Sequence, residues 1–466
     1  MINKLHPQVI QDKVTGGERL DDCNCDCACT TSTSFVSAQT LLADLCNIQS
    51  QHPKDFHTAA LNAEYTMCYS PFTRPIVVNQ SALDIISRSK HTGKNIIADF
   101  DGRAHVNKQL CAWIHLTDNC NLDCAYCYLH HAHSTMTPAT GYAVIDATFR
   151  SALLHGYDAV KLKFAGGEPL LCFPLILDLH QYARSLAEKH SINLDGVVLS
   201  NGIMLTALKV KQIRAAGLRL MISLDGIGEI HDRQRHYPDG HGSFDQVAHA
   251  IDRALSIGLI PDISITISGR NAEGLPEVVA WVLERDLPFS LNFYRENDLS
   301  ASQADLHLED DRIINGMLAA YKVIEDNLPR RTLLASLMDR ANLSASHLHT
   351  CSIGQSYMVF DTQGGIARCQ MDITNPITNC NDPDPLTTLR NNTTEIINPS
   401  VNDKEECAVC QWRYWCGGGC PLQAYRATGH YDTKSPYCAI YQKLFPQVIR
   451  MEGLRLLKYA NELTLA

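Results

Sequence analysis

Three cysteines stand close together about a quarter of the way along the chain, in the stretch NCNLDCAYCYLHHA, which covers residues 119–132. Cys120, Cys124 and Cys127 are three thiols, whereas a structural zinc takes four ligands and disulfides join cysteines in pairs. Ferredoxins hold their four-iron clusters with four cysteines, so three would leave one iron without a protein ligand. Such an open iron can bind a substrate or cosubstrate, as the open position does in catalytic zinc sites. The stretch therefore predicts a catalytic iron–sulfur site.

The elements that position this site are predicted to alternate between strand and helix from residue 110 to about 297. Helical patterns lie between the strands, for instance at 174–189, 206–216, 245–257 and 275–285. This alternation implies a parallel sheet with right-handed crossovers. Six such units are too few for a closed eight-stranded barrel, so we expect an α/β fold built on a partial (βα)6 barrel with its chemistry at the C-terminal strand ends. The six predicted strands are 111–117, 159–165, 195–201, 218–224, 262–268 and 289–294.

Glycine and polar residues follow several of these strands. FAGGEP (164–169) ends the second strand, SNG (200–202) the third and SLDG (223–226) the fourth, with HDRQR shortly afterwards. Glycines at such ends let the backbone approach a ligand closely. One strand-end glycine or aspartate is usually a turn residue, but several at successive strand ends indicate a ligand held in the barrel.

The motif CNLDCAYC resembles the signature of radical S-adenosylmethionine (radical SAM) enzymes. The resemblance implies that the open iron binds the amino and carboxylate groups of SAM, and that reductive cleavage yields a 5′-deoxyadenosyl radical, which removes a hydrogen atom from an unactivated C–H bond. It also implies that Glu168 meets the methionine ammonium, and that Ser200 and Asn201 contact the ribose and methionine sides. The residues expected around SAM are Tyr126, Gly166, Gly167, Glu168, Ser200, Asn201, Ser223, Asp225 and Arg235.

A second set of cysteines lies in the C-terminal third of the chain. Paired C-x2-C knuckles, common in zinc sites, are not the pattern, because one C-x2-C is followed by C-x5-C and C-x3-C spacings. The run resembles the SPASM domain, which binds auxiliary iron–sulfur clusters in peptide-modifying radical SAM enzymes. The resemblance implies an outer cluster on Cys407, Cys410, Cys416 and Cys438 and an inner one on Cys351, Cys369 and Cys420. The family's further cysteine shortly after the first is missing here, so the inner cluster has an open iron, or Cys380 or another side chain completes it.

The remaining segments are assigned from composition and periodicity. Residues 1–34 are expected to be a flexible tail, with Cys23, Cys25, Cys27 and Cys29 at alternate positions. Residues 35–105 are predicted to form a small α+β, winged-helix-like module, whose PIVVNQSALDII stretch is similar to RiPP recognition elements, the peptide-binding domains of peptide-modifying enzymes. Its predicted elements are a helix from Ala38 to about Ile48, a strand at 75–79, a helix at 81–93 and a short helix at 94–100. The other predicted units are the barrel (108–300), a helical linker (301–345), the SPASM domain (346–450) and the end of a C-terminal helix (451–466). A hairpin is predicted at 357–369, and the C-terminal helix as a whole at 439–462.

Composition restricts the environment and the partners of the chain. Its 466 residues suggest about three units, and a net charge of −10 argues against general binding to nucleic acid or anionic membranes. We find no secretory signal pattern and no apolar stretch of spanning length, so we expect a cytoplasmic protein. Thiols stay reduced there, and nineteen cysteines then indicate metal or redox chemistry.

The resemblance favours an enzyme that abstracts hydrogen from a ribosomally made precursor peptide and forms an oxidised or cross-linked product (thioether, ether or C–C). It implies an electron donor such as a flavodoxin or ferredoxin. In formylglycine-forming sulfatase maturases an Asp follows the cysteine that matches Cys369, whereas this chain has Gln370, which disfavours that alternative. A small-molecule substrate, for example a tetrapyrrole, is the other alternative. Candidate bases or radical partners are Asp372, Tyr294 and Glu296.

Overall fold

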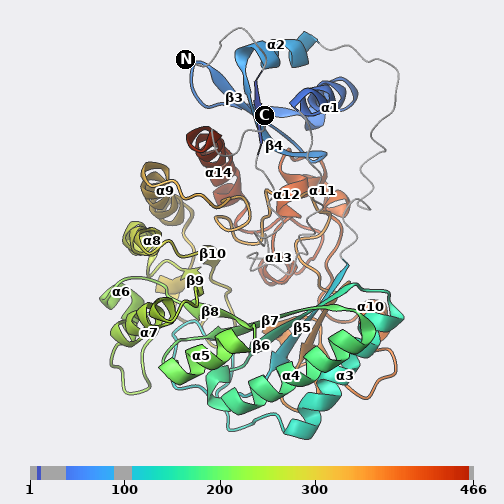
Figure 1. The fold of residues 1–466 in the computed structure, drawn as a ribbon, viewed down its shortest axis with the longest axis vertical. Helices are drawn as coiled ribbons and strands as arrows, with labels where there is room; N and C mark the ends of the chain where they lie inside the picture. Colours follow the sequence, from blue (N-terminus) through green and yellow to red (C-terminus); the bar gives the residue numbers. More distant parts are fainter. Residues whose placement is uncertain (1–7, 12–37, 89–107, 461–466) are drawn as a thin grey trace.

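The computed structural model describes residues 8–11, 38–88 and 108–460. In Figure 1 a small N-terminal unit lies at the top, a large α/β unit at the bottom, and the C-terminal segments between them. The large unit is built on a nine-stranded sheet in the order β10-β9-β8-β7-β6-β5-β11-β12-β13. The N-terminal unit has its own four-stranded sheet, in the order β1-β4-β3-β2.

The six predicted strands of the large sheet are all present and run parallel to one another. Alternate residues of β5 face opposite sides, as the two-residue repeat of a strand requires. Leu110, Ala112 and Ile114 join the main core with the surrounding helices, whereas Cys111 and Trp113 lie in a second apolar cluster with β11 and β12. The strands are β5 Gln109–His115, β6 Ala159–Ala165, β7 Asn193–Ser200, β8 Arg219–Ser223, β9 Asp262–Ile267 and β10 Phe289–Phe293.

Helices connect consecutive strands. Two of them begin at threonine N-caps, because Thr137 Oγ1 accepts the amide N–H of Thr140 and Thr206 Oγ1 that of Lys209. The helices of this unit are α3 Pro138–Leu154, α4 Phe173–His190, α5 Ala207–Ala215, α6 Glu229–Asp232, α7 Phe244–Ser256 and α8 Leu275–Glu284. The α/β fold expected from the sequence is therefore confirmed.

The predicted hairpin at 357–369 is present and also extends the large sheet. Strand β11 (Tyr357–Phe360) pairs in parallel with β5, so that Tyr357 stands opposite Cys111. Strands β12 (Gly365–Ala367) and β13 (Thr378–Asn379) then continue the sheet in antiparallel fashion. Cys369, two residues after β12, thereby lies in the same apolar cluster as Cys111 of β5.

The prediction that residues 301–345 are a helical linker is wrong for the second half of that range. Helix α9 (Asp310–Asp326) ends at the C-cap Asn327. Pro329 follows two residues later, and a proline at that position cannot continue the helix because it lacks an N–H group and restricts the residue before it. The next residues are irregular and are held by tertiary hydrogen bonds. For example, the Leu333 amide donates to Glu452 Oε2 at 3.1 Å.

The C-terminal segments are short helices joined by loops, followed by one long helix. Helix α14 extends over most of the range predicted from the sequence and includes Pro446. Its residues Val448 and Ile449 are buried in the main core. The helices are α10 Pro385–Asn391, α11 Glu405–Ala408, α12 Arg413–Cys416, α13 Pro421–Thr428 and α14 Cys438–Lys458.

The N-terminal unit contains more strand than the sequence predicted. Helices α1 (Ala38–Gln51) and α2 (Gln80–Arg88) were expected, as was β4 (Thr73–Asn79), whereas β2 (His57–Ala60) and β3 (Tyr65–Ser70) were not. The expected tail over residues 1–34 is corrected at β1 (Val9–Ile10), because both residues are buried against β4. The other residues of that range, including Cys23, Cys25, Cys27 and Cys29, lie outside the described residues, as does the short helix expected at 94–100.

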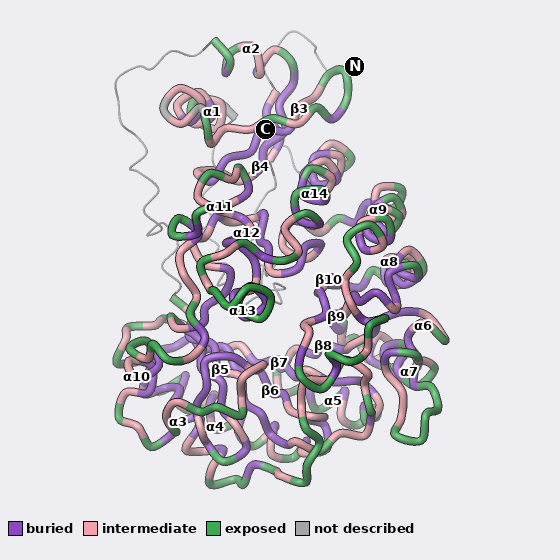
Figure 2. The backbone as a smooth tube through the Cα atoms, turned by 180° about the vertical axis from the view of Figure 1, so that it is seen from behind, coloured by how far each residue is buried: buried purple, intermediate pink, exposed green. Residues whose placement is uncertain are grey.

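This unit packs on the C-terminal segments, as Figure 2 shows from behind. The Tyr69 ring of β3 stacks on Trp412 with centroids 5.6 Å apart, and Trp412 also contacts Phe445 of α14. Arg413 forms an ion pair with Asp55 at 2.7 Å. Among the residues that the structure describes, no helix has the length and apolar character needed to cross a bilayer.

Candidate functional site

The loop between β5 and α3 carries Cys120, Cys124 and Cys127, and hydrogen bonds from several distant segments fix it. The Asp123 amide donates to His236 O at 2.8 Å and the Ala125 amide to Gln234 O at 2.9 Å. Asn297 and Gln303, which follow β10, donate to the carbonyls of Tyr126 and Ala125. The sequence did not single out these two amides, because nothing in their local pattern differs from an ordinary polar loop.

Glycines 166 and 167 bring the end of β6 onto the start of this loop. A Cβ at Gly166 would lie 2.6 Å from Thr117 O, and one at Gly167 would lie 2.3 Å from Asn119 O. The Gly167 amide donates to Thr117 O and the Glu168 amide to Asn119 O. The close approach predicted for these glycines is thus between two segments of the chain itself.

Glu168 ties the GGEP segment to the end of β7. Its carboxylate is fully buried and accepts hydrogen bonds from the Leu170 amide (2.9 Å), the Ser200 hydroxyl (2.8 Å) and the Asn201 amide (2.8 Å). Burial raises the pKa of the Glu168 carboxyl, and these hydrogen bonds oppose the shift. A carboxylate has about four acceptor positions, so three are used by the protein. Glu168 is thus a positioning residue, and its expected contact with an ammonium stays a prediction.

Asn201 and Arg235 bring N–H groups to two of the cysteines. Asn201 Nδ2 lies 3.8 Å from Cys120 Sγ, and Arg235 Nη1 lies 3.7 Å from Cys124 Sγ. Both contacts favour a thiolate over a thiol, since hydrogen bonds to the charged form stabilise it. Arg235 is held by Asp225 at 2.7 Å and lies over the Tyr126 ring.

Asp225 connects the cysteine loop to β9 and is closed to solvent. Its Oδ2 accepts from Tyr126 Oη at 2.6 Å as well as from Arg235, and its Oδ1 accepts from the Thr266 amide at 2.8 Å. Tyr126, Asp225 and Arg235 were expected around SAM, and the structure brings them into one hydrogen-bonded group beside Cys124. Ser223 ends β8 nearby in sequence and is partly exposed.

Two nitrogens on β5 are buried without a hydrogen-bond partner, Trp113 Nε1 and His115 Nδ1. The other ring nitrogen of His115 pairs with Asp118 Oδ1 at 2.8 Å. A cavity of about 440 Å³ opens beside Cys124 and Cys127 and is lined also by His130, His131 and Gln303. None of the residues predicted to contact SAM lines it.

Burial keeps the three thiols protonated until a metal binds. It raises the pKa of Cys120 and Cys127 to about 11 and that of Cys124 to about 12. Each of the three is electrostatically coupled to another member of the group. Metal binding must therefore release protons, as it does in other thiolate sites.

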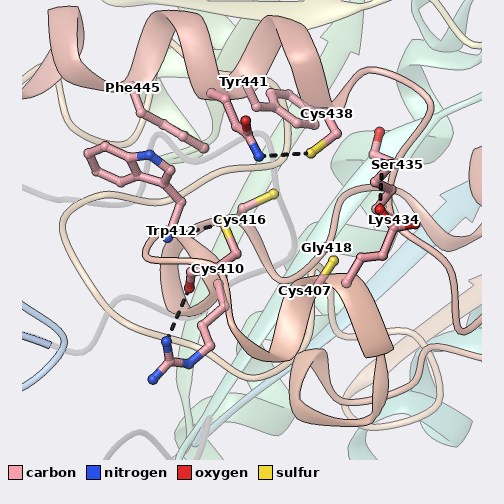
Figure 3. Close-up of a pocket in the computed structure, with 13 residues that line it drawn as sticks. Cys407, Cys410, Trp412, Cys416, Gly418, Lys434, Ser435, Cys438, Tyr441 and Phe445 are labelled. Atoms are coloured by element: carbon pink, nitrogen blue, oxygen red, sulfur yellow. Dashed lines mark hydrogen bonds and ion pairs between the residues drawn. The ribbon is translucent and has the colours of Figure 1, made fainter. Parts of the chain in front are cut away.

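The four cysteines expected to hold the outer cluster surround one cavity of about 90 Å³. Figure 3 shows Cys407, Cys410, Cys416 and Cys438 on its walls, with Trp412 and Phe445 beside them. Burial raises the pKa of Cys407 to about 11 and of Cys416 to about 12, and neighbouring cysteines add to both shifts. These four residues come from α11, α12, the loop between them and the first residue of α14.

Cys351, Cys369 and Cys420 are likewise together. Cys351 and Cys369 are buried in the second apolar cluster, Cys420 packs against it, and the charges of Cys351 and Cys420 both act on Cys369. Cys380 belongs instead to the main core, where its amide donates to Gly364 O. The suggestion that Cys380 completes the inner group therefore finds no support. Cys111 of β5 lies in the same cluster as Cys351 and Cys369.

A buried lysine lies near cysteines of both C-terminal groups. Lys404 Nζ has no hydrogen-bond partner, although the side chain is fully buried. An unpaired buried ammonium is strongly unfavourable unless negative charge stands close by. Anionic thiolate-bound clusters would supply that charge, so the residues present fit iron–sulfur groups.

Single-metal sites are a different case. Within residues 8–11, 38–88 and 108–460, no three cysteine, histidine or carboxylate side chains are arranged to hold one metal ion. Thiolates around one zinc stand about 3.8 Å apart, from the 2.3 Å bond and tetrahedral geometry. A four-iron cluster is larger and its ligands stand farther apart.

The candidate catalytic residues are not brought together. Tyr294 is buried and its hydroxyl pairs with Ser300 at 2.6 Å. Glu296 pairs with His307 at 3.2 Å, and Asp372 accepts from Asn375 at 2.6 Å. Asp372 lies close to one cysteine of the inner group, since its amide donates to Cys369 O.

Comparison with known protein families identifies the domain that contains the cysteine loop. The family model of the radical SAM superfamily matches residues 114–282, from the end of β5 to α8. The chain contains a radical SAM domain. This domain implies SAM and a four-iron cluster. The binding of that cluster by Cys120, Cys124 and Cys127, the motif that carried the resemblance, stays a prediction. The predicted membership is confirmed.

Relatives of this radical SAM protein act on different substrates. It is 25% identical over 353 residues to an AdoMet-dependent heme synthase of Methanosarcina barkeri. This alignment covers 71% of this chain and 96% of the relative. It is 34% identical over 177 residues to a probable GTP 3',8-cyclase of Methanocella arvoryzae, covering 37% of this chain and 53% of that protein.

Two solved structures share the fold over a longer part of the chain. The anSMEcpe structure with bound AdoMet has a TM-score of 0.60 at 19% identity and covers 76% of this chain and 99% of that one. Streptococcus suis SuiB, bound to its precursor peptide SuiA, has a TM-score of 0.50 at 15% identity and covers 83% and 98%. The likeness in fold thus extends beyond residues 114–282.

Proposed function

We propose that this radical SAM protein is a peptide maturase. It removes a hydrogen atom from a residue of a ribosomally made precursor peptide and leaves an oxidised or cross-linked product. The observation that carries the proposal is the arrangement of three units in one chain: a radical SAM domain, two further cysteine groups, and an N-terminal β-sheet unit packed on the segments that hold those cysteines.

The first site would bind the cluster through Cys120, Cys124 and Cys127, and SAM at the remaining iron. A bound cluster with SAM supplies the 5′-deoxyadenosyl radical. Asn201 and Arg235 donate to the cysteine sulfurs and so stabilise their negative charge. Glu168 holds the Ser200–Asn201 turn, and its one free acceptor position would meet the SAM ammonium. Asp225 keeps Arg235 and Tyr126 in place.

The C-terminal cysteines would hold two auxiliary clusters. The outer group is Cys407, Cys410, Cys416 and Cys438, and the inner group is Cys351, Cys369 and Cys420. Loss of one hydrogen atom to the radical, followed by loss of a proton and an electron, makes the product two hydrogens lighter. An auxiliary cluster would take up that electron, and a flavodoxin or ferredoxin would supply the one needed to cleave SAM. Asp372, close to Cys369 in the chain, is the candidate that would accept the proton.

The N-terminal unit favours a peptide over a small molecule. Its fold contains a β-sheet with two helices on one face, and an extended peptide can pair with such a sheet at an edge. SuiB is shown with a precursor peptide and another anSMEcpe structure with a Cp18Cys peptide. A peptide would lie near both this unit and the C-terminal cysteines, because Tyr69 and Trp412 join them.

A small-molecule substrate is the second candidate. The heme synthase relative matches over nearly its whole length, which favours a tetrapyrrole. The sequence offers Gln370 where formylglycine-forming maturases have an aspartate, so that reaction is the least favoured.

The test is anaerobic incubation of the reconstituted full chain with SAM, dithionite and either a peptide encoded beside its gene or an iron porphyrin. We expect 5′-deoxyadenosine together with a peptide two hydrogen masses lighter, and no change in the porphyrin. The matched control is Cys124→Ala, which should form neither product. A modified porphyrin with an unchanged peptide would overturn the proposal in favour of the second candidate.

A further inference from the structure

Lys404 is the one lysine in the described part of the chain whose ammonium is both buried and without a hydrogen-bond partner. Its backbone begins the turn that carries the first outer cysteine, because Lys404 O accepts from the amides of Cys407 (2.9 Å) and Ala408 (2.8 Å). The sequence places it just before the C-x2-C pair, where a lysine would ordinarily be taken for a surface residue.

Cysteines of both C-terminal groups act on this ammonium. Cys407 and Cys416 belong to the outer group, and Cys420 and Cys351 to the inner group, and all four are electrostatic neighbours of Lys404. The ammonium therefore lies close enough to both cysteine groups to feel their charge.

The glycine run 417–419 makes room for this lysine. A Cβ at Gly418 would lie 2.7 Å from Lys404 Nζ and 2.7 Å from its Cδ. Gly418 also has φ of +82°, a conformation that favours glycine. The middle glycine of the run thus lets an ammonium approach the backbone closely.

We propose that Lys404 is a positioning charge shared by the two auxiliary clusters, which raises the reduction potential of both. The proposal rests on the auxiliary clusters proposed above. A fixed positive charge in a low-dielectric interior favours the more negative, reduced form of a nearby cluster. One lysine placed near both groups would thus favour electron uptake at either of them.

Lys434 provides the matched control. It also lies near the outer cysteines and lines their cavity, but its side chain is about half exposed and pairs with Glu406. Water and this carboxylate screen its charge, so its removal should have little effect on either cluster.

The experiment is an anaerobic redox titration followed by electron paramagnetic resonance. It uses the full chain with Cys120, Cys124 and Cys127 all replaced by alanine, so that only auxiliary signals remain. We expect Lys404→Met to lower the reduced-to-oxidised ratio of both signals at least tenfold at a fixed potential, which corresponds to 59 mV for one electron. Lys404→Arg and Lys434→Met should stay within threefold of the parent. Equal ratios in Lys404→Met and parent, at equal iron content, would overturn the proposal.

A second measurement covers the case in which Lys404→Met does not load clusters. In the cluster-free full chain the ammonium lacks its negative partners, so Lys404→Met should raise the melting temperature. A lower melting temperature would overturn the proposal. Iron and sulfide analysis separates failure of the auxiliary clusters from failure of the role given to Lys404. About four irons per wild-type chain would refute the auxiliary clusters themselves. About twelve irons, with the same cluster potentials in Lys404→Met and parent, would refute only the role of Lys404.

Discussion

Asp225→Asn tests whether one buried carboxylate holds the cysteine loop in place. Asp225 accepts hydrogen bonds from Tyr126 Oη (2.6 Å), Arg235 Nε (2.7 Å) and the Thr266 amide (2.8 Å), and it is fully buried. The amide that replaces it has the same shape but no charge. It would leave the Arg235 guanidinium, which is about nine-tenths buried, without its ion-pair partner.

The magnitude follows from the burial of both groups. Breaking a buried ion pair by removing one partner costs about 3–5 kcal/mol, because the other charge is left unpaired. The value should fall near the lower end, since Arg235 also has Cys124 Sγ at 3.7 Å and the Tyr126 ring. We expect Asp225→Asn to lower the free energy of unfolding of the radical SAM domain by about 3 kcal/mol.

The assay is urea unfolding of the cluster-free full chain, monitored by circular dichroism under reducing conditions. The double variant Asp225→Asn, Arg235→Gln removes both charges and should recover part of the loss, as paired removal of buried charges often does. A loss below about 1 kcal/mol in the single variant, the range of an exposed ion pair, would refute the reasoning.

Three further predictions follow from the same neighbourhood and from the contact between units. Burial lowers the pKa of His231 from 6.5 to about 4, so between these pH values the unfolded chain binds more protons than the folded chain. The free energy of unfolding should therefore fall by an amount on the order of 3 kcal/mol as the pH drops from 6.5 to 4. His231→Gln should flatten this pH dependence when it is measured by urea titration. Gly167→Ala places a methyl 2.3 Å from Asn119 O, so iron bound after reconstitution should drop by about one cluster while the C-terminal signals persist; full iron content would contradict this. Tyr69→Ala removes the stack on Trp412 and a large buried side chain, which should cost about 3–5 kcal/mol and expose the N-terminal unit to limited proteolysis, whereas an unchanged digestion pattern would argue against this contact.

The sequence predicts the strands of the radical SAM domain well, because each is a short segment rich in apolar residues, several of them followed by glycine or polar residues. AVKLKFA matches β6 at both ends. Cys407, Cys410, Cys416 and Cys438, which the family resemblance grouped, line one cavity. Local signals of this kind require no knowledge of distant contacts.

Features that depend on long-range pairing were missed. The hairpin at 357–369 was predicted, but its parallel pairing with β5 was not, since about 240 residues separate Tyr357 from Cys111. Glu168 was expected to face SAM, whereas three donors, among them Ser200 and Asn201, enclose its carboxylate. No pattern within a short window distinguishes such a residue from a ligand-facing one.

The most direct test of the central claim is the amount of 5′-deoxyadenosine formed from SAM and dithionite by reconstituted variants. The account predicts that wild type and Cys369→Ala both form it, and that Cys124→Ala forms none. Formation by Cys124→Ala at the wild-type level would contradict the assignment of Cys120, Cys124 and Cys127 as the site of SAM cleavage.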